Sequence, residues 1–132
     1  MHTHGPLHIE IFNDPMFSEN GMLLWCEDGP DCWFVDPGLP PQPEQLAGVV
    51  QRLALTPRAI VLTHCHADHI AGVGPLRGAF GEIPIVCPRD EADLLVDADA
   101  NLSSSLGVPI TAPPADQLIG PGDPLATGEL EW

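Results

Sequence analysis

Residues Leu62–Gly72 read LTHCHADHIAG, and this stretch decides the fold and the site that we expect. Three imidazoles and one carboxylate occupy the window from His64 to His69. Imidazole nitrogens and carboxylate oxygens are the donors that zinc and similar divalent ions bind in proteins. A lone histidine is more often a packing or surface residue, but four strong ligand types behind an apolar run and before a glycine-containing helical start indicate a metal site.

The spacing within this window favours two ions over one. His64 and His66 are two residues apart, so their side chains point the same way in extended chain. Asp68 and His69 are adjacent, so their side chains diverge and can face a second ion beside the first. The intervening Cys65 is expected to point away from the histidines, and we interpret it as a spacer.

The segments around this motif predict an α/β fold. A short apolar strand at 59–62 precedes the motif, and a helix at 44–55 precedes that strand, with apolar residues at the helical period. Alternating or continuous apolar runs predict the remaining strands, at 7–12, 22–26, 32–35 and 83–87. Two further helices are expected at 68–79 and 88–96, and Pro75 with the glycines at 72, 74 and 78 should make the first of them short or irregular. His2 and His4 are expected in a flexible tail.

Composition excludes several classes of function. The chain has 132 residues, which normally form one domain, and its 19 acidic residues outnumber its 4 basic ones, for a formal charge of −15. Nucleic-acid binding needs clustered basic residues, so we expect no nucleic-acid partner. No apolar run of 18 residues suggests a membrane span, and residues 1–6 do not resemble a secretory signal, so we expect a cytoplasmic protein without a membrane partner.

The cysteines do not indicate a second metal site. Cys26 and Cys32 flank a predicted hairpin turn, where they could face each other, but in a cytosolic chain we expect free thiols. No Cys-x-x-Cys pair occurs anywhere in the sequence.

The motif Thr63-His-x-His-x-Asp-His69 resembles the signature of the metallo-β-lactamase superfamily. The resemblance implies that His64 and His66 bind metal 1 and that Asp68 and His69 bind metal 2. It also implies a catalytic role for Asp68 in orienting the metals and water. Two Zn²⁺ ions are the expected cofactors of a complete site, with iron or manganese as alternatives.

The turn Asp36-Pro37-Gly38 lies where this superfamily has an aspartate beneath the metal site. The resemblance therefore makes Asp36 a residue that accepts the second N–H of a ligand histidine. The residue types of this segment would equally suit an ordinary turn.

The resemblance covers almost all of the chain but only the first part of the superfamily fold, a four-layer αββα sandwich. We expect residues 1–132 to be a single incomplete domain, an α/β half-sandwich with a mixed sheet, flanking helices and no C-terminal half. The superfamily completes its site with a later histidine, a bridging aspartate and a final histidine, and no histidine follows His69. The alternative is a short protein that completes its site by oligomerising, with self-association through the exposed sheet.

Within the superfamily, the motif, the Asp36 turn and the strand after Asn20 most resemble the glyoxalase II-like branch. That resemblance implies hydrolysis of a small-molecule thioester by attack of metal-bound hydroxide. Three alternatives stay open: a mononuclear iron persulfide dioxygenase, a lactonase or β-lactam hydrolase, and a truncated metal-binding fragment without catalytic activity.

Overall fold

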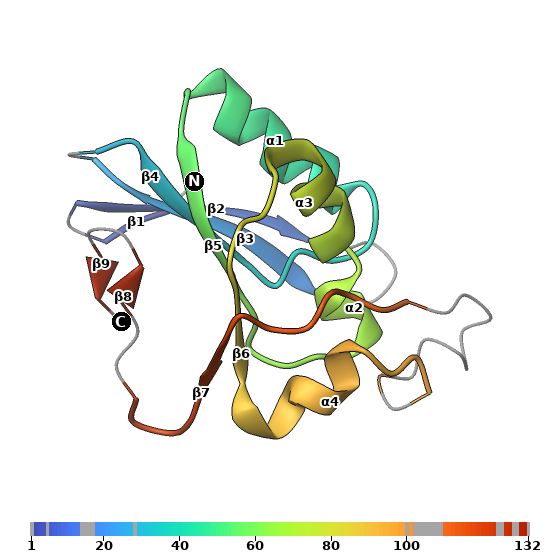
Figure 1. The fold of residues 1–132 in the computed structure, drawn as a ribbon. Helices are drawn as coiled ribbons and strands as arrows, with labels where there is room; N and C mark the ends of the chain where they lie inside the picture. Colours follow the sequence, from blue (N-terminus) through green and yellow to red (C-terminus); the bar gives the residue numbers. More distant parts are fainter. Residues whose placement is uncertain are drawn as a thin grey trace.

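The computed structural model describes residues 2–4, 6–13, 18–27, 29–99, 101, 110–123, 126–127 and 130–131. Most strands of this part form one mixed sheet in chain order (Figure 1). They are β1 (His2–His4), β2 (Leu7–Asn13), β3 (Asn20–Cys26), β4 (Asp31–Val35), β5 (Thr56–Val61), β6 (Ile85–Pro88) and β7 (Gln117–Ile119). A short separate pair consists of β8 (Ala126–Thr127) and β9 (Leu130–Glu131). The expected mixed α/β sheet is confirmed.

The strands predicted at 7–12, 22–26 and 32–35 are β2, β3 and β4, which pair antiparallel with Ile9 opposite Leu24 and Leu24 opposite Trp33. The expectation of a flexible tail at His2 and His4 is wrong, because these residues form β1 and pair with β2. The backbone of β2 provides a free edge for this pairing, which residue type alone does not reveal.

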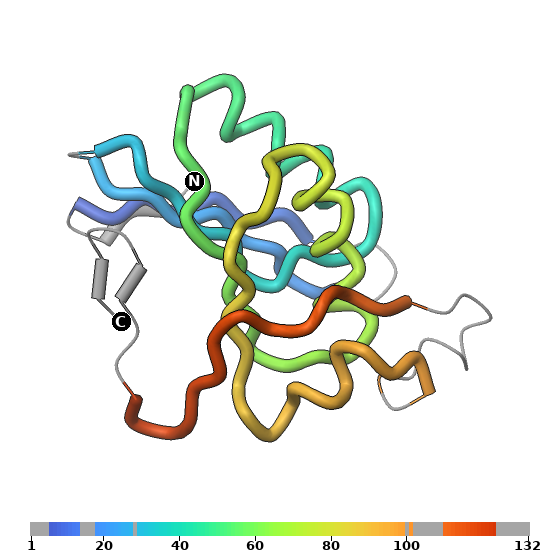
Figure 2. Tube along the Cα trace, in the orientation of Figure 1, coloured from blue at the N-terminus to red at the C-terminus, as the bar shows by residue number. Residues whose placement is uncertain are grey.

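From β4 onward the neighbouring strands are parallel. Parallel neighbours need a crossover connection, and α1 (Gln42–Arg52) provides the one between β4 and β5. Its predicted apolar face is confirmed by the buried side chains of Leu46, Val49 and Val50. Figure 2 shows how residues 110–119 return across the molecule and reach the edge of the sheet beside β6.

The helix expected at 68–79 is two helices, α2 (Ala67–Ile70) and α3 (Val73–Phe80). The helical structure is interrupted at Gly72, whose N–H donates to Pro37 O at 2.9 Å. A Cβ at position 72 would lie 2.9 Å from Gly38 O, so only glycine allows this approach. The expected helix at 88–96 is likewise a 3-10 turn, η1 (Arg89–Glu91), followed by α4 (Ala92–Leu95).

The sheet carries apolar side chains on both faces. The larger cluster lies under α1 and α3 and includes Phe34, Leu46 and Leu76. The second cluster contains Leu24, Trp33, Val35, Ala59, Val61 and Val86, each at most 8% exposed. These side chains are buried within the chain. Self-association through an exposed sheet is not tested by this burial and stays a prediction. The expectation that residues 1–132 form a single incomplete domain also stays a prediction.

The cysteines are free thiols, as expected. Cys32 belongs to the larger cluster and Cys26 packs against the second, so these two thiols lie on opposite faces and do not face each other. Cys65 is buried with its Sγ 3.3 Å from Cys87 Sγ, which agrees with its interpretation as a spacer. Among the described residues, no helix has the length and apolar character needed to cross a bilayer.

A buried glutamine connects three segments that lie far apart in the sequence. Gln42 is 0% exposed and donates from Nε2 to Phe12 O at 2.8 Å and to Glu19 O at 3.0 Å. Its Oε1 accepts from Gly38 N at 2.9 Å. The first turn of α1 therefore holds the end of β2, the start of β3 and the turn after β4 in one place.

Substitution of Gly38 by alanine should destabilise the protein. A Cβ at this position would lie 2.5 Å from Asp68 O, Gln42 Oε1 and Glu19 Oε2, so the backbone must shift at a cost of about 1–3 kcal/mol. Gly48→Ala is the matched control, because no atom lies within 4 Å of its Cβ and alanine favours the helix by about 0.5–1 kcal/mol. Urea denaturation of both variants measures the difference, and equal stabilities would contradict this packing.

Candidate metal centre

The site lies at the carboxyl ends of two adjacent parallel strands. Asp36 directly follows β4, and the motif residues Thr63 and His64 follow β5. Asp36 N donates to Val61 O at 3.1 Å, which keeps the two strand ends together. Residues just beyond the carboxyl ends of parallel strands are placed by the rigid sheet on a common edge.

The carboxylate of Asp36 holds both ends of the motif. Its Oδ1 accepts from Thr63 N at 2.7 Å, and its Oδ2 accepts from the Thr63 hydroxyl. Oδ2 also lies 3.1 Å from His69 Nδ1, which donates to it. Asp36 is 3% exposed and has a φ of +49°, in the left-handed region. This is the position expected for a residue that fixes a ligand histidine.

The structure brings the four expected ligands to one region. The ring centroids of His64 and His69 are 3.6 Å apart, and those of His64 and His66 are 5.2 Å apart at nearly right angles. Asp68 Oδ2 lies 3.6 Å from His69 Nε2. His66 therefore lies beside His64, and His64 lies beside His69. His69 in turn lies beside Asp68. Their role as ligands stays a prediction.

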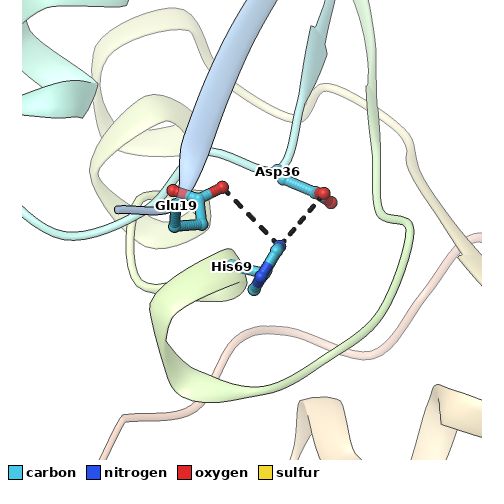
Figure 3. A group of neighbouring side chains, drawn as sticks. All are labelled: Glu19, Asp36 and His69. Atoms are coloured by element: carbon cyan, nitrogen blue, oxygen red, sulfur yellow. Dashed lines mark hydrogen bonds and ion pairs between the residues drawn. The ribbon is translucent and has the colours of Figure 1, made fainter. Parts of the chain in front are cut away.

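A group of three residues in the described part of the chain, which differs from the motif set, also brings potential ligand atoms together. One atom each of Glu19, Asp36 and His69 lies within 4.8 Å of the others (Figure 3). Sequence reasoning missed Glu19, because it lies between Ser18 and Asn20-Gly21, a composition typical of a solvated turn. Only the burial of the Glu19 side chain against Gly38 reveals it.

Glu19 is an unusual carboxyl group. Its side chain is 1% exposed, and neither carboxyl oxygen has a hydrogen-bond partner. Burial raises the pKa of Glu19 from 4.5 to about 8, although the nearby His69 opposes this shift. Its Oε1 lies 3.6 Å from His69 Nδ1. A cation near this carboxyl would offset the cost of its burial.

The surroundings shift the pKa values of His69 and His64 in opposite directions. Burial would lower the pKa of His69, but the hydrogen bond to Asp36 and the charges of Asp36, Asp68 and Glu19 outweigh burial and raise it. Burial lowers the pKa of His64, and neighbouring His69 adds to the effect. A lowered pKa keeps His64 neutral, which is the form that binds a metal. The nitrogen and oxygen donors of the site fit a divalent ion such as zinc.

The sequence matches the family model described as the metallo-beta-lactamase superfamily over residues 20–132. It is 38% identical over 101 residues to the probable metallo-hydrolase YqgX of Bacillus subtilis, covering 76% of this chain and 46% of that protein. It is 38% identical over 85 residues to a hydroxyacylglutathione hydrolase of Yersinia enterocolitica, covering 64% of this chain and 33% of that protein. The chain thus spans less than half the length of these two relatives.

Solved structures give the same assignment of the fold. The B3 metallo-beta-lactamase BLEG-1 superposes with a TM-score of 0.82 at 34% identity, covering 94% of this chain and 58% of that one. TTHA1623, solved in a di-iron-bound form, superposes with a TM-score of 0.63 at 30% identity, covering 82% of this chain and 52% of that one.

Substitution of Asp36 by asparagine should weaken zinc binding by about 10- to 100-fold, the range typical of residues that orient a metal ligand. An asparagine amide can donate toward His69 Nδ1 and so favours the wrong imidazole tautomer. Competition with a chromophoric chelator measures the zinc affinity. Asp93→Asn, at an exposed position of α4, is the control with the same change of charge. Equal affinities of the two variants would contradict the assigned role of Asp36.

The stability of the metal-free chain should fall as pH rises from about 5 to 8. In this range, folded Glu19 retains a proton that the unfolded chain releases, so the unfolded state gains stability relative to the folded state. Glu19→Gln removes this titration, so its stability relative to wild type should increase with pH. Urea denaturation at pH 5 and pH 8 in the presence of chelator measures the difference in the free energy of unfolding between the variant and wild type, here called the gap. Glu44→Gln, at an exposed position of α1, should show a constant gap.

Proposed function

Because the chain belongs to the metallo-β-lactamase superfamily, we propose that it carries the first half of a metal-dependent hydrolase site for a small thioester. One observation carries this proposal: the motif side chains adjoin at the carboxyl edge of the sheet, with Asp36 bonded to both Thr63 and His69. The resemblance to a hydroxyacylglutathione hydrolase supports the thioester as substrate. Since the chain spans less than half the length of YqgX and of the hydroxyacylglutathione hydrolase, the activity of the whole protein is part of the proposal.

In this proposal His64 and His66 hold one ion, and Asp68 and His69 hold a second. A bound divalent ion supplies Lewis acidity toward the substrate carbonyl and lowers the pKa of water. Asp36 holds His69 Nδ1, so that Nε2 faces Asp68 at 3.6 Å. The side chain of Asp68 is 24% exposed, which lets it contact both an ion and the attacking water and orient the water.

The identity of the metal separates two enzyme classes. Zinc is the proposed cofactor of the hydrolase, in line with the nitrogen and oxygen donors. A mononuclear iron persulfide dioxygenase is the second candidate; the similar protein TTHA1623 was solved in a di-iron-bound form, which supports iron as an alternative metal but not a mononuclear site. Elemental analysis of the protein purified without added metal tests this choice. Zinc in the purified protein favours the hydrolase, and iron with oxygen uptake favours the dioxygenase.

His66→Ala should abolish thioester hydrolysis. The zinc-loaded chain is assayed with an acyl-glutathione thioester, and the released thiol is measured with a chromogenic disulfide. Loss of an ion ligand should lower the rate by more than the 10- to 100-fold typical of outer partners. Zinc binding without any turnover in the wild type would instead support a metal-binding fragment. Turnover that His66→Ala leaves unchanged would contradict the proposed site.

A further inference from the structure

Glu19 is a buried carboxyl group whose position calls for an explanation. Buried polar atoms almost always have hydrogen-bond partners, and an unpaired one is costly. Both carboxyl oxygens of Glu19 lack a partner, and its side chain is 1% exposed. None of the roles described above for the metal motif uses this residue, although its Oε1 lies 3.6 Å from His69 Nδ1.

We propose that Glu19 is a second positioning carboxylate for His69, which acts with Asp36 on ring nitrogen Nδ1 and so directs Nε2 toward the ion. This inference rests on the proposed metal centre. The ligand class concerned is a divalent cation bound on the Nε2 side of the ring.

The geometry around His69 supports a shared role of the two carboxylates. Nδ1 lies 3.1 Å from Asp36 Oδ2 and 3.6 Å from Glu19 Oε1, and Figure 3 shows the two contacts converging on this nitrogen. Nε2, on the other side of the ring, lies 3.6 Å from Asp68 Oδ2. A ring turned by half a rotation would place a carbon against both carboxylates and would lose the hydrogen bond to Asp36. The arrangement therefore selects one ring orientation.

The surroundings of Glu19 keep its carboxyl group in place. Its backbone carbonyl accepts from Gln42 Nε2 at 3.0 Å, which anchors the residue to α1. Its Oε2 lies so close to Gly38 that a Cβ there would be 2.5 Å away. The carboxyl group thus has no room to turn toward solvent.

The carboxylate of Asp36 binds other groups besides His69. It also accepts hydrogen bonds from the backbone and the hydroxyl of Thr63. Neither carboxyl oxygen of Glu19 makes a hydrogen bond of this kind among the described contacts, and its other polar neighbour is the side chain of Gln42. Asp36 therefore joins the strand end to the motif, and Glu19, once ionised, adds negative charge directed at Nδ1.

The imidazole tautomer of His69 provides a test that needs no metal. Ring ¹⁵N chemical shifts are measured in the metal-free chain above the pKa of Glu19, which is about 8, for wild type, Glu19→Gln and Glu44→Gln. We expect a protonated Nδ1 in the wild type and in Glu44→Gln. In Glu19→Gln, whose carboxamide can donate to Nδ1, we expect a population protonated at Nε2. Identical His69 shifts in Glu19→Gln and wild type would overturn the proposal, since a packing role alone predicts that result.

Cation affinity provides the second readout. Co²⁺ binding, followed by chelator competition, should be about 10-fold weaker in Glu19→Gln than in wild type. Glu44→Gln makes the same change in net charge far from the site and should bind Co²⁺ as wild type does. The metal-free melting temperature of Glu19→Gln should not fall, which excludes loss of folding as the cause. Unchanged Co²⁺ affinity in Glu19→Gln would overturn the proposal.

His66→Ala separates this inference from the function on which it rests. If His66→Ala binds Co²⁺ as tightly as wild type, the proposed two-ion site fails. The tautomer measurement still decides whether Glu19 positions His69, because it is made without metal.

Discussion

The hydrogen bonds that Asp36 accepts from Thr63 and His69 are the interaction on which the site depends. Hydrogen bonds to an ionised group contribute about 1.5–3 kcal/mol each, more than neutral ones. They tie the turn after β4 to both ends of the metal motif, Thr63 and His69. The sheet sets the position of Asp36, and Asp36 in turn sets the positions of the motif side chains.

This arrangement gathers negative charge in a buried place. Asp36 and Glu19 both have nearly inaccessible side chains, and buried carboxylates are costly unless a positive group compensates them. The chain has four arginines and no lysine, and Arg58 and Arg77 pair with carboxylates elsewhere. Protonated His69 and a bound cation are therefore the positive charges that can compensate these two carboxylates. Glu19, whose buried carboxyl group should weaken the metal-free fold as pH rises, would be stabilised by an ion bound in the proposed site.

Much of the fold could be predicted from apolar periodicity alone. The strands β2 to β4, α1 and the strand before the motif follow from patterns within single segments, and the structure confirms them. The helix expected at 68–79 was predicted to be short or irregular, but its division into two helices was not, because the break depends on the close approach of Gly72 to Pro37, which lies 35 positions earlier. The pairing of β1 was missed for the same reason, since it depends on the free edge of β2.

The sequence by itself determined the metal motif, its family and the candidate role of Asp36, because these depend on residue type and spacing along the chain. Only the tertiary structure decided that Glu19 belongs to the site. Its neighbours in sequence are turn residues, and its neighbours in space come from α1, from the turn after β4 and from α2. Burial and the convergence of distant atoms are properties of the folded chain, and no local pattern encodes them.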